Sequence, residues 1–246
     1  MGLKYFKQFI SDPWFWRILK NTIVLNLWML VLYFPTPIIL ALVLNELKNK
    51  WFKKAAQTIS YMPYFLSTVV VCGFITTILQ NDGLVNQMLT ALGLEKIQFL
   101  MEPGWFRPIY VISEIWQQCG WGSIIYLSAL AGVDSQLYEA AAIDGASKWK
   151  QLIHVSLPGI APVISIQFLL TVGKLLTVGY EKILLLYTGA TYETADVIST
   201  YVYRRGLMEA NYSYGSAVSI FQAVFALILV VWANKMAQKM GQTSLW

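Results

Sequence analysis

Long stretches without a charged side chain constrain this 246-residue chain more than any other feature of its sequence. No charged residue occurs from Asn21 to Asn45, from Ala55 to Asn81, or from Asn211 to Asn234. A helix needs roughly 20 predominantly apolar residues to cross the hydrocarbon core of a bilayer. The runs are continuous and not alternating, which favours helices over the strands of a barrel. We therefore expect an all-α, polytopic membrane helix bundle.

Two further apolar segments bring the expected number of spans to five. Residues 108–132 contain Glu114 as their one charged residue, and the segment from Val155 to Gly173 has none. Composition agrees, because charged residues make up 13% of the chain, whereas a typical soluble domain has about 25%. The expected spans are residues 22–45, 57–80, 108–132, 160–187 and 213–234.

The segment before the first span has a different character. Residues 1–20 mix aromatic side chains with lysine and arginine. We expect an amphipathic segment that lies in the membrane interface and is broken at Pro13. An unstructured tail is the alternative. Residues 21–246 then form the transmembrane domain.

Basic loops give an expected orientation. The segment Asn45–Gln57 carries four lysines, and short basic loops stay cytoplasmic. Alternation of five spans then places residues 133–159 and the C-terminus in the cytoplasm, and the N-terminus outside. With residues 1–20 left out, the inside segments carry eight lysines and arginines against four outside.

The loop of residues 133–159 is unusually polar for a segment between two apolar spans. Asp134 or Ser135 can cap a helix by accepting a backbone hydrogen bond. The residues Leu137–Ile143 favour helix, and Gly145 can end that helix by adopting a positive φ. We expect a short helix, a turn and a second short segment, all facing the cytoplasm.

The residue spacing in this loop resembles the signature loop of permease subunits in binding-protein-dependent ABC importers. That signature reads EAA, three residues, Gly, nine residues, an aliphatic residue, one residue, then LP. In this sequence it is formed by Glu139, Ala140, Ala141, Gly145, Val155, Leu157 and Pro158. Valine stands at 155, where the family usually has isoleucine. The loop also lies two expected spans before the C-terminus, as it does in the family.

Two other stretches, Gly2–Thr22 and Glu193–Phe221, resemble the carbohydrate-uptake branch of this family, whose members include maltose-permease-like proteins and permeases for complex oligosaccharides. Relatives in that branch handle fragments of plant-wall or acidic polysaccharides. The resemblance implies the type I ABC importer permease fold. Family members usually have six spans, so the usual first span is expected to be missing from this chain.

The resemblance also implies partners and a location. The chain would be a non-catalytic transport subunit of a bacterial cell membrane, working with a dimer of ABC ATPases, a second homologous permease, an extracytoplasmic solute-binding protein and an oligosaccharide substrate. Glu139 would pair with a basic group on the ATPase. The sequence has no GxxxxGK[ST] loop, so ATP and Mg²⁺ would be bound by the ATPase. The basic residues are scattered and give no indication of nucleic-acid binding.

Charged residues inside the expected spans are candidates for lining the solute path, because such charges usually face the bundle interior or a wet cavity. Lys174 and Glu181 are seven residues apart and would share one face of a continuous helix. With Tyr180 and Glu114 they form the candidate translocation path. The alternative is that Lys174 and Glu181 only brace the bundle by pairing with neighbours.

The sequence predicts neither a catalytic nor a metal site. Cys72 and Cys119 fall within expected spans and are interpreted as packing residues. His154 is the sole histidine, and no cluster of histidine, cysteine or carboxylate has metal-ligand spacing. These observations disfavour an intramembrane enzyme. The competing function is an ion-gradient-driven secondary transporter, for which internal repeats are expected, and none is evident.

Overall fold

The computed structural model describes residues 3–239 and 243–244. All regular elements in these residues are helical, as the sequence predicts. They are α1 (Lys4–Ile10), α2 (Phe15–Trp28), the π-turn η1 (Met29–Tyr33), α3 (Pro35–Glu46), α4 (Lys50–Tyr61), η2 (Met62–Phe65), α5 (Thr68–Leu79), α6 (Leu84–Ala91), α7 (Pro103–Ala131), α8 (Ser135–Ile143), α9 (Lys148–Gln151), η3 (Leu152–Ser156), α10 (Leu157–Val172), α11 (Tyr180–Leu186), η4 (Gly189–Thr191), α12 (Tyr192–Ala195), α13 (Ile198–Val202), η5 (Tyr203–Met208) and α14 (Tyr212–Lys239).

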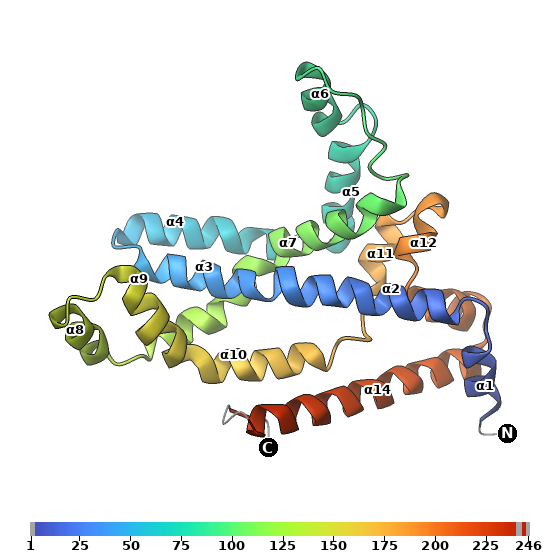
Figure 1. Ribbon diagram of the computed structural model, residues 1–246. Coiled ribbons are helices and arrows are strands. Elements are labelled where there is room, and N and C mark those ends of the chain that lie inside the picture. Colours follow the sequence, from blue (N-terminus) through green and yellow to red (C-terminus); the bar gives the residue numbers. More distant parts are fainter. Residues whose placement is uncertain (1–2, 240–242, 245–246) are drawn as a thin grey trace.

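Four helical stretches in the described residues are long and apolar enough to cross a membrane, where five spans were expected. They are Phe15–Glu46, Thr68–Ala91, Lys148–Val172 and Tyr212–Lys239. Helix α7 has 29 residues, enough for about 44 Å, but it is more polar and includes Arg107 and Glu114. It runs through the middle of the molecule beside α3 (Figure 1), where protein and not lipid surrounds much of its polar surface.

The first apolar helical stretch begins earlier than expected, and residues 3–20 are divided between α1 and the start of α2. The chain breaks between α1 and α2, near Pro13 as predicted, but α2 already starts at Phe15. Phe9 and Phe15 are buried in an aromatic core with Tyr201 and Tyr214. These side chains find apolar partners near the C-terminal helix α14, so they do not depend on the membrane interface for burial.

The first span carries a π-turn at its middle. The Phe34 amide donates to the carbonyl of Met29 over 3.0 Å, a bond one residue longer than the helical repeat. Pro35 and Pro37 follow directly and lack the N–H groups that would continue a regular ladder. The π-turn is thus the local consequence of the two prolines, and such turns are frequent at functional sites.

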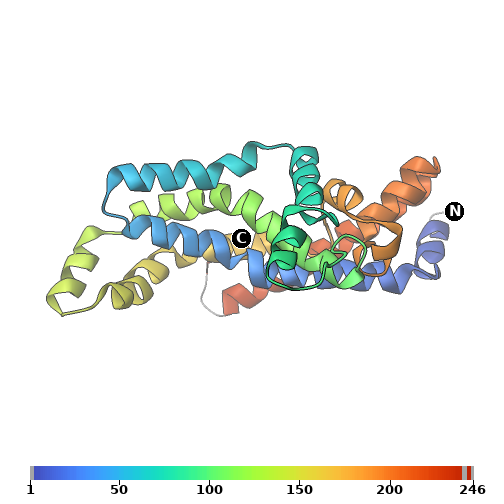
Figure 2. The same cartoon turned by 90° about the horizontal axis from the view of Figure 1, so that it is seen from above.

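The expected span at residues 57–80 is not one helix. Helix α4 ends at Tyr61, η2 contains Pro63, and the Ser67 hydroxyl accepts from the amide of Val70 to start α5. Helix α5 then runs in a different direction from α4 (Figures 1 and 2). A proline and a new helix cap therefore divide this apolar run, although its composition is uniform.

The expected span at residues 160–187 is also divided. Helix α10 ends at Val172, and α11 starts only at Tyr180. The connection, residues 173–179, is held by short turn bonds and by the Gln222 side chain, which donates to the carbonyl of Leu176 over 2.6 Å. Glycine at both ends of the connection weakens its helical preference. The spans expected at 108–132 and 213–234 correspond to α7 and α14.

Most connections lie at two ends of the elongated molecule, whereas α6 and the loop that follows it project to one side (Figure 1). The lysine-rich turn after α3 and the helices α8 and α9 lie at one end, which we call the α8 end. Helix α1 and residues 187–211 lie at the other, the α1 end. The long helices α2, α3, α7, α10 and α14 run along the long axis of the molecule, whereas α5 stands across them (Figure 1).

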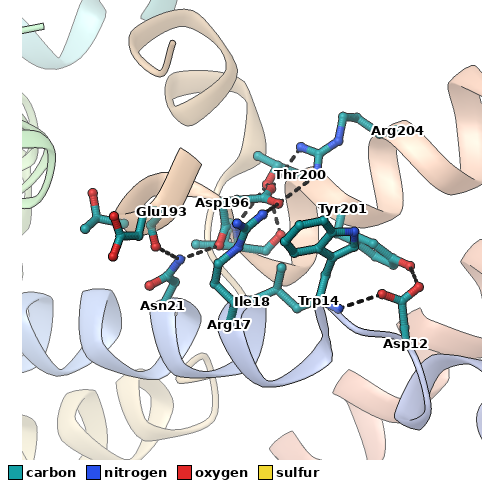
Figure 3. A network of polar contacts seen from close by, with 12 residues as sticks. Asp12, Trp14, Arg17, Ile18, Asn21, Glu193, Asp196, Thr200, Tyr201 and Arg204 are labelled. Carbon is teal, nitrogen blue, oxygen red and sulfur yellow. Dashed lines mark hydrogen bonds and ion pairs between the residues drawn. The ribbon is translucent and has the colours of Figure 1, made fainter. Parts of the chain in front are cut away.

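A polar network fixes the α1 end (Figure 3). The buried carboxylate of Asp196 accepts two hydrogen bonds from Arg204, at 2.8 and 2.7 Å, and one from Thr200. The Arg17 guanidinium on α2 lies 3.8 Å from the same carboxylate. Burial alone lowers the pKa of Arg204, but the bonds and charge of Asp196 leave that pKa raised above its ordinary value. The Arg204 guanidinium therefore stays charged.

Hydrogen bonds from one side chain of α2 join that helix to residues 193–196. The side-chain amide of Asn21 donates to the backbone carbonyls of Glu193 and Asp196, at 2.8 and 3.0 Å. Its oxygen accepts from Arg107 on α7 over 2.9 Å. One asparagine thus connects the first span, α7 and the connection before α13, so these parts are held as one unit.

Candidate functional site

The segment 133–159 contains the short capped helix and the turn that the sequence predicts. The Asp134 carboxylate caps α8 by accepting from the amide of Gln136 over 2.9 Å. Helix α8 is followed by Gly145 with φ +74°, and the amide of Ala146 donates back to the carbonyl of Ala141. This is the glycine-terminated helix end expected at this position. A separate second segment was expected, but α9 and the turn η3 run without a break into α10, so that these residues are the first part of one helical stretch, Lys148–Val172.

The signature residues lie on the outside of the α8 end. Glu139, Ala140, Gly145 and Pro158 are exposed, and Ala141, Val155 and Leu157 are half-buried. Within the described residues, no ion pair involves Glu139. Ile143 at the end of α8 is 86% exposed and Trp149 on α9 is 69% exposed. The segment therefore presents apolar and acidic side chains together, at a point where no described part of this chain covers them.

Three contacts connect α8 and α9 to the long helices. The Tyr138 hydroxyl lies 2.9 Å from the hydroxyl of the buried Ser156, next to the start of α10. Lys148 lies 3.7 Å from Glu46 at the end of α3. The backbone of Gly159 lies so close to Val133 that a methyl group at 159 would come within 2.7 Å of it. Helix α8 thus contacts the residue before α10, and α9 contacts the end of α3.

A second feature is a cavity of about 500 Å³, bounded by the first span, α7, α10 and the connection 173–179, in whose lining Trp121, Lys174 and Thr177 are exposed. Its walls carry aromatic rings, amides, hydroxyls and one ammonium group. The lining side chains that bear these groups are Asn26, Tyr33, Phe34, Tyr110, Trp121, Tyr126, Gln167, Thr171, Lys174 and Thr177. The size is that of a small-ligand site.

The structure separates the four residues proposed for the solute path. Lys174 lines the cavity, but Tyr180, Glu181 and Glu114 are absent from its lining. Lys174 and Glu181 do not share a helix face, because the helix is interrupted between them. Tyr180 stacks on Tyr203 with ring centroids 5.4 Å apart, and Glu181 is exposed.

Glu114 belongs to a buried ion pair beside the cavity. Its carboxylate lies 2.6 Å from the ammonium of Lys182, which is 5% exposed. The same ammonium donates to Gln117 over 2.8 Å and lies 6.0 Å from the ring centroid of Tyr110, a lining residue. Lys182 and Gln117 were not selected from the sequence. The available signal was that Lys182, like Glu114, is a charge inside an apolar run.

Comparison with known proteins decides the family. Residues 18–242 match the family described as binding-protein-dependent transport system inner membrane component. The chain belongs to this family. It is thus a multi-pass membrane permease, and the seven signature residues lie within its matched region.

Relatives of this permease are similar over its whole length. It is 43% identical to the polygalacturonan/rhamnogalacturonan transport system permease protein YteP of Bacillus subtilis, with 100% of this chain and 77% of that protein covered. A crystal structure of a bacterial alginate ABC transporter in complex with an alginate pentasaccharide-bound periplasmic protein superposes with TM-score 0.96 at 44% identity, covering 100% of this chain and 85% of that one. A crystal structure of a bacterial ABC transporter involved in the import of the acidic polysaccharide alginate gives TM-score 0.94 at 45% identity, covering 97% and 84%.

Proposed function

We propose that this permease forms half of the translocation path of an ATP-driven oligosaccharide importer in a bacterial cell membrane. Its partners would be a second homologous permease, a dimer of ABC ATPases and an extracytoplasmic solute-binding protein. ATP and Mg²⁺ would be bound by the ATPases, and this chain would be a non-catalytic subunit. The α8 end and the C-terminus would face the cytoplasm.

The observation that carries this proposal is the exposed α8 segment. An isolated short helix with uncovered apolar side chains fits a groove on another protein. The exposed Glu139 supplies a negative charge for a basic group in that groove, and the small side chains of Ala140 and Ala141 allow close approach. The positive φ of Gly145 shapes the turn that follows α8.

Coupling would follow from how α8 is attached. ATP-driven closure of the two ATPases would move α8, and the Tyr138–Ser156 contact would pass that movement to the start of α10. Helix α10 and the connection after it form one wall of the cavity. ATP and the transported solute would each act through a preference for one of two states of the permease pair, inward-open or outward-open.

The cavity supports a sugar substrate. Its aromatic rings offer apolar faces, while its amides and hydroxyls can exchange hydrogen bonds with a hydroxyl-rich ligand. The relatives named above transport polygalacturonan, rhamnogalacturonan or alginate, according to their descriptions. We therefore propose an oligosaccharide as the transported solute.

The test is reconstitution of the whole importer in liposomes. ATP-dependent uptake of an oligosaccharide is expected for the unmodified complex, and Glu139→Lys should reduce both uptake and the co-purification of the ATPases. Glu95→Lys is the matched control, because Glu95 is an exposed carboxylate near the tip beyond α6. Uptake that needs an ion gradient and not ATP would overturn the proposal in favour of a secondary transporter.

A further inference from the structure

Positive charge is concentrated at the start of α4 without a counter-ion. Four lysines lie within seven consecutive positions there: Lys48, Lys50, Lys53 and Lys54. Three of them are exposed and Lys53 is half-buried. Within the described residues, no ion pair involves any of the four ammonium groups, and Glu46, the acidic residue that precedes them, is paired elsewhere. The chain itself therefore leaves this charge unbalanced.

The position of these charges is unfavourable for the helix. The N-terminus of a helix carries a partial positive charge, and the first turn of α4 contains no acidic side chain. Lys50 and Lys54 are four positions apart, a spacing at which like charges repel. Asn49 starts the helix by accepting from the amides of Trp51 and Phe52 over 3.0 and 3.2 Å. An anion bound here would stabilise both the lysines and the helix end.

The apolar side of α4 faces away from the protein. The half-buried side chains of α4 are mostly small or polar, among them Ala56 and Ser60, and the backbone of Ser60 lies directly against Gly120 of α7. The other side carries Trp51, which is 83% exposed, and Ile59, which is 69% exposed. An amphipathic helix that turns its apolar side outward needs an apolar partner to cover that side.

The combination fits the surface of a lipid bilayer. Helix α4 runs beside α3 and α7 along the long axis of the molecule, so its lysines lie at the level where the first span ends (Figures 1 and 2). Helix α8 extends further along that axis (Figures 1 and 2). Lysine and tryptophan at the end of an apolar helix face are typical of the membrane interface, and lysines next to a membrane span attract anionic headgroups.

We propose that the start of α4 binds an anionic phospholipid, with its phosphate at Lys50, Lys53 and Lys54 and its acyl chains along Trp51 and Ile59. The lipid belongs to the leaflet at the α8 end, and only the naming of that leaflet as cytoplasmic rests on the proposed function. Phosphatidylglycerol suits this site better than phosphatidylcholine, because both carry a phosphate but the choline ammonium is repelled by the lysines.

The experiment measures which lipid lies beside α4 in the assembled importer. Ala55→Cys, at an exposed position one turn after Trp51, is made in a background without Cys72 and Cys119 and labelled with a fluorophore. The complex is reconstituted in phosphatidylcholine vesicles that contain increasing fractions of phosphatidylglycerol brominated on its acyl chains, or of equally brominated phosphatidylcholine. We expect brominated phosphatidylglycerol to quench the label at a lower fraction than brominated phosphatidylcholine does.

Removal of the lysines should abolish this preference. In the triple variant Lys50→Gln, Lys53→Gln and Lys54→Gln, the fraction of brominated phosphatidylglycerol that half-quenches the label should rise by about tenfold or more. The reason is that each lysine near an anionic membrane surface contributes about fivefold to binding. Replacement of the same three lysines by arginine keeps the charge and should retain the preference.

The matched control removes the same charge at the other end of the molecule. Lys4→Gln, Lys7→Gln and Lys20→Gln change exposed positions at the α1 end and should leave the quenching unchanged. Thermal unfolding checks that the α4 variant is folded. Because like-charge repulsion at the helix start is relieved, its melting temperature in phosphatidylcholine should be no lower than that of the unmodified complex, whereas phosphatidylglycerol should raise the melting temperature of the unmodified complex more.

Each contrary result has a distinct meaning. Equal quenching by the two lipids, or an unchanged preference in the α4 variant, would show that these lysines select no lipid. An equal loss of preference in the α1-end control would reduce the effect to net charge. Quenching by neither lipid in the assembled importer would assign this face to a protein partner. All of these results would overturn the inference, and none depends on uptake, so failure of the proposed function is recognised separately.

Discussion

The ammonium group of Lys182 is buried between one acidic and one amide partner. Glu114 balances its charge, and Gln117 in turn donates to the carbonyl of Leu66 over 3.1 Å. These contacts tie α11 to α7 and to the start of the break before α5. The bracing role considered for charges in the fourth expected span thus falls to Lys182, whereas Lys174 faces the cavity.

Removal of one partner from this pair should be strongly destabilising. Lys182→Met leaves the Glu114 carboxylate buried and uncompensated, a change that costs about 3–5 kcal/mol in buried pairs. We expect a lower yield of assembled complex and a lower melting temperature, measured by thermal unfolding in detergent.

The double variant provides the control. Glu114→Gln combined with Lys182→Met removes both charges, so it should recover much of the lost stability. If the double variant were as unstable as the sum of the two single ones, the two side chains would not interact as the structure indicates.

At the scale of helices, regular elements follow the sequence closely where an apolar run is not interrupted. Helices α7 and α14 match expected spans, and α8 has the predicted cap and glycine-terminated end. The two divided spans were missed because hydropathy measures composition and not continuity. Pro63 and the Ser67 cap divide the first run, and glycines at 173 and 179 flank the break in the second. The packing of α5 against α11, which accompanies both breaks, is not visible in the sequence.

Gly145 tests the end of α8. Its φ of +74° suits glycine, and a methyl group there would meet nothing within 4 Å. Gly145→Ala should therefore act through backbone strain alone, at about 1 kcal/mol, and weaken coupling of ATP hydrolysis to uptake. Gly145→Asn, which tolerates a positive φ better, should retain more coupling. Equal defects in both variants would point to loss of a direct contact and not to strain.

At the scale of the molecule, most connections lie at two separate ends and the α6 loop projects apart from both, and this pattern gives the orientation proposal a direct test. In a background without Cys72 and Cys119, single cysteines at the exposed positions Lys54, Trp149 and Glu95 can be labelled with an impermeant maleimide. In right-side-out vesicles, we expect labelling at 95 alone; in inverted vesicles, at 54 and 149. Labelling of 54 and 149 on opposite sides would contradict the alternating arrangement.

The polar network at the α1 end could not be predicted from the sequence, for a physical reason. Asn21 and Asp196 lie 175 positions apart yet share a hydrogen bond, and no local pattern reports such a contact. The cavity could not be predicted for the same reason, because its walls come from segments that are distant in the chain. What the sequence does supply is the local signal: the signature spacing, the apolar runs and the unusual charges inside them.

The Glu114–Lys182 pair also has a consequence for biosynthesis. Lys182 follows Glu114 by 68 positions, so at about 5–20 residues per second the ribosome delivers it roughly 3–14 s later. During that interval the carboxylate on α7 lacks its partner, and its release into lipid would be costly. Membrane insertion of α7 should therefore be delayed, with the helix retained at the translocon until α11 has been made. Nascent chains arrested before residue 182 should remain there longer than chains arrested after it.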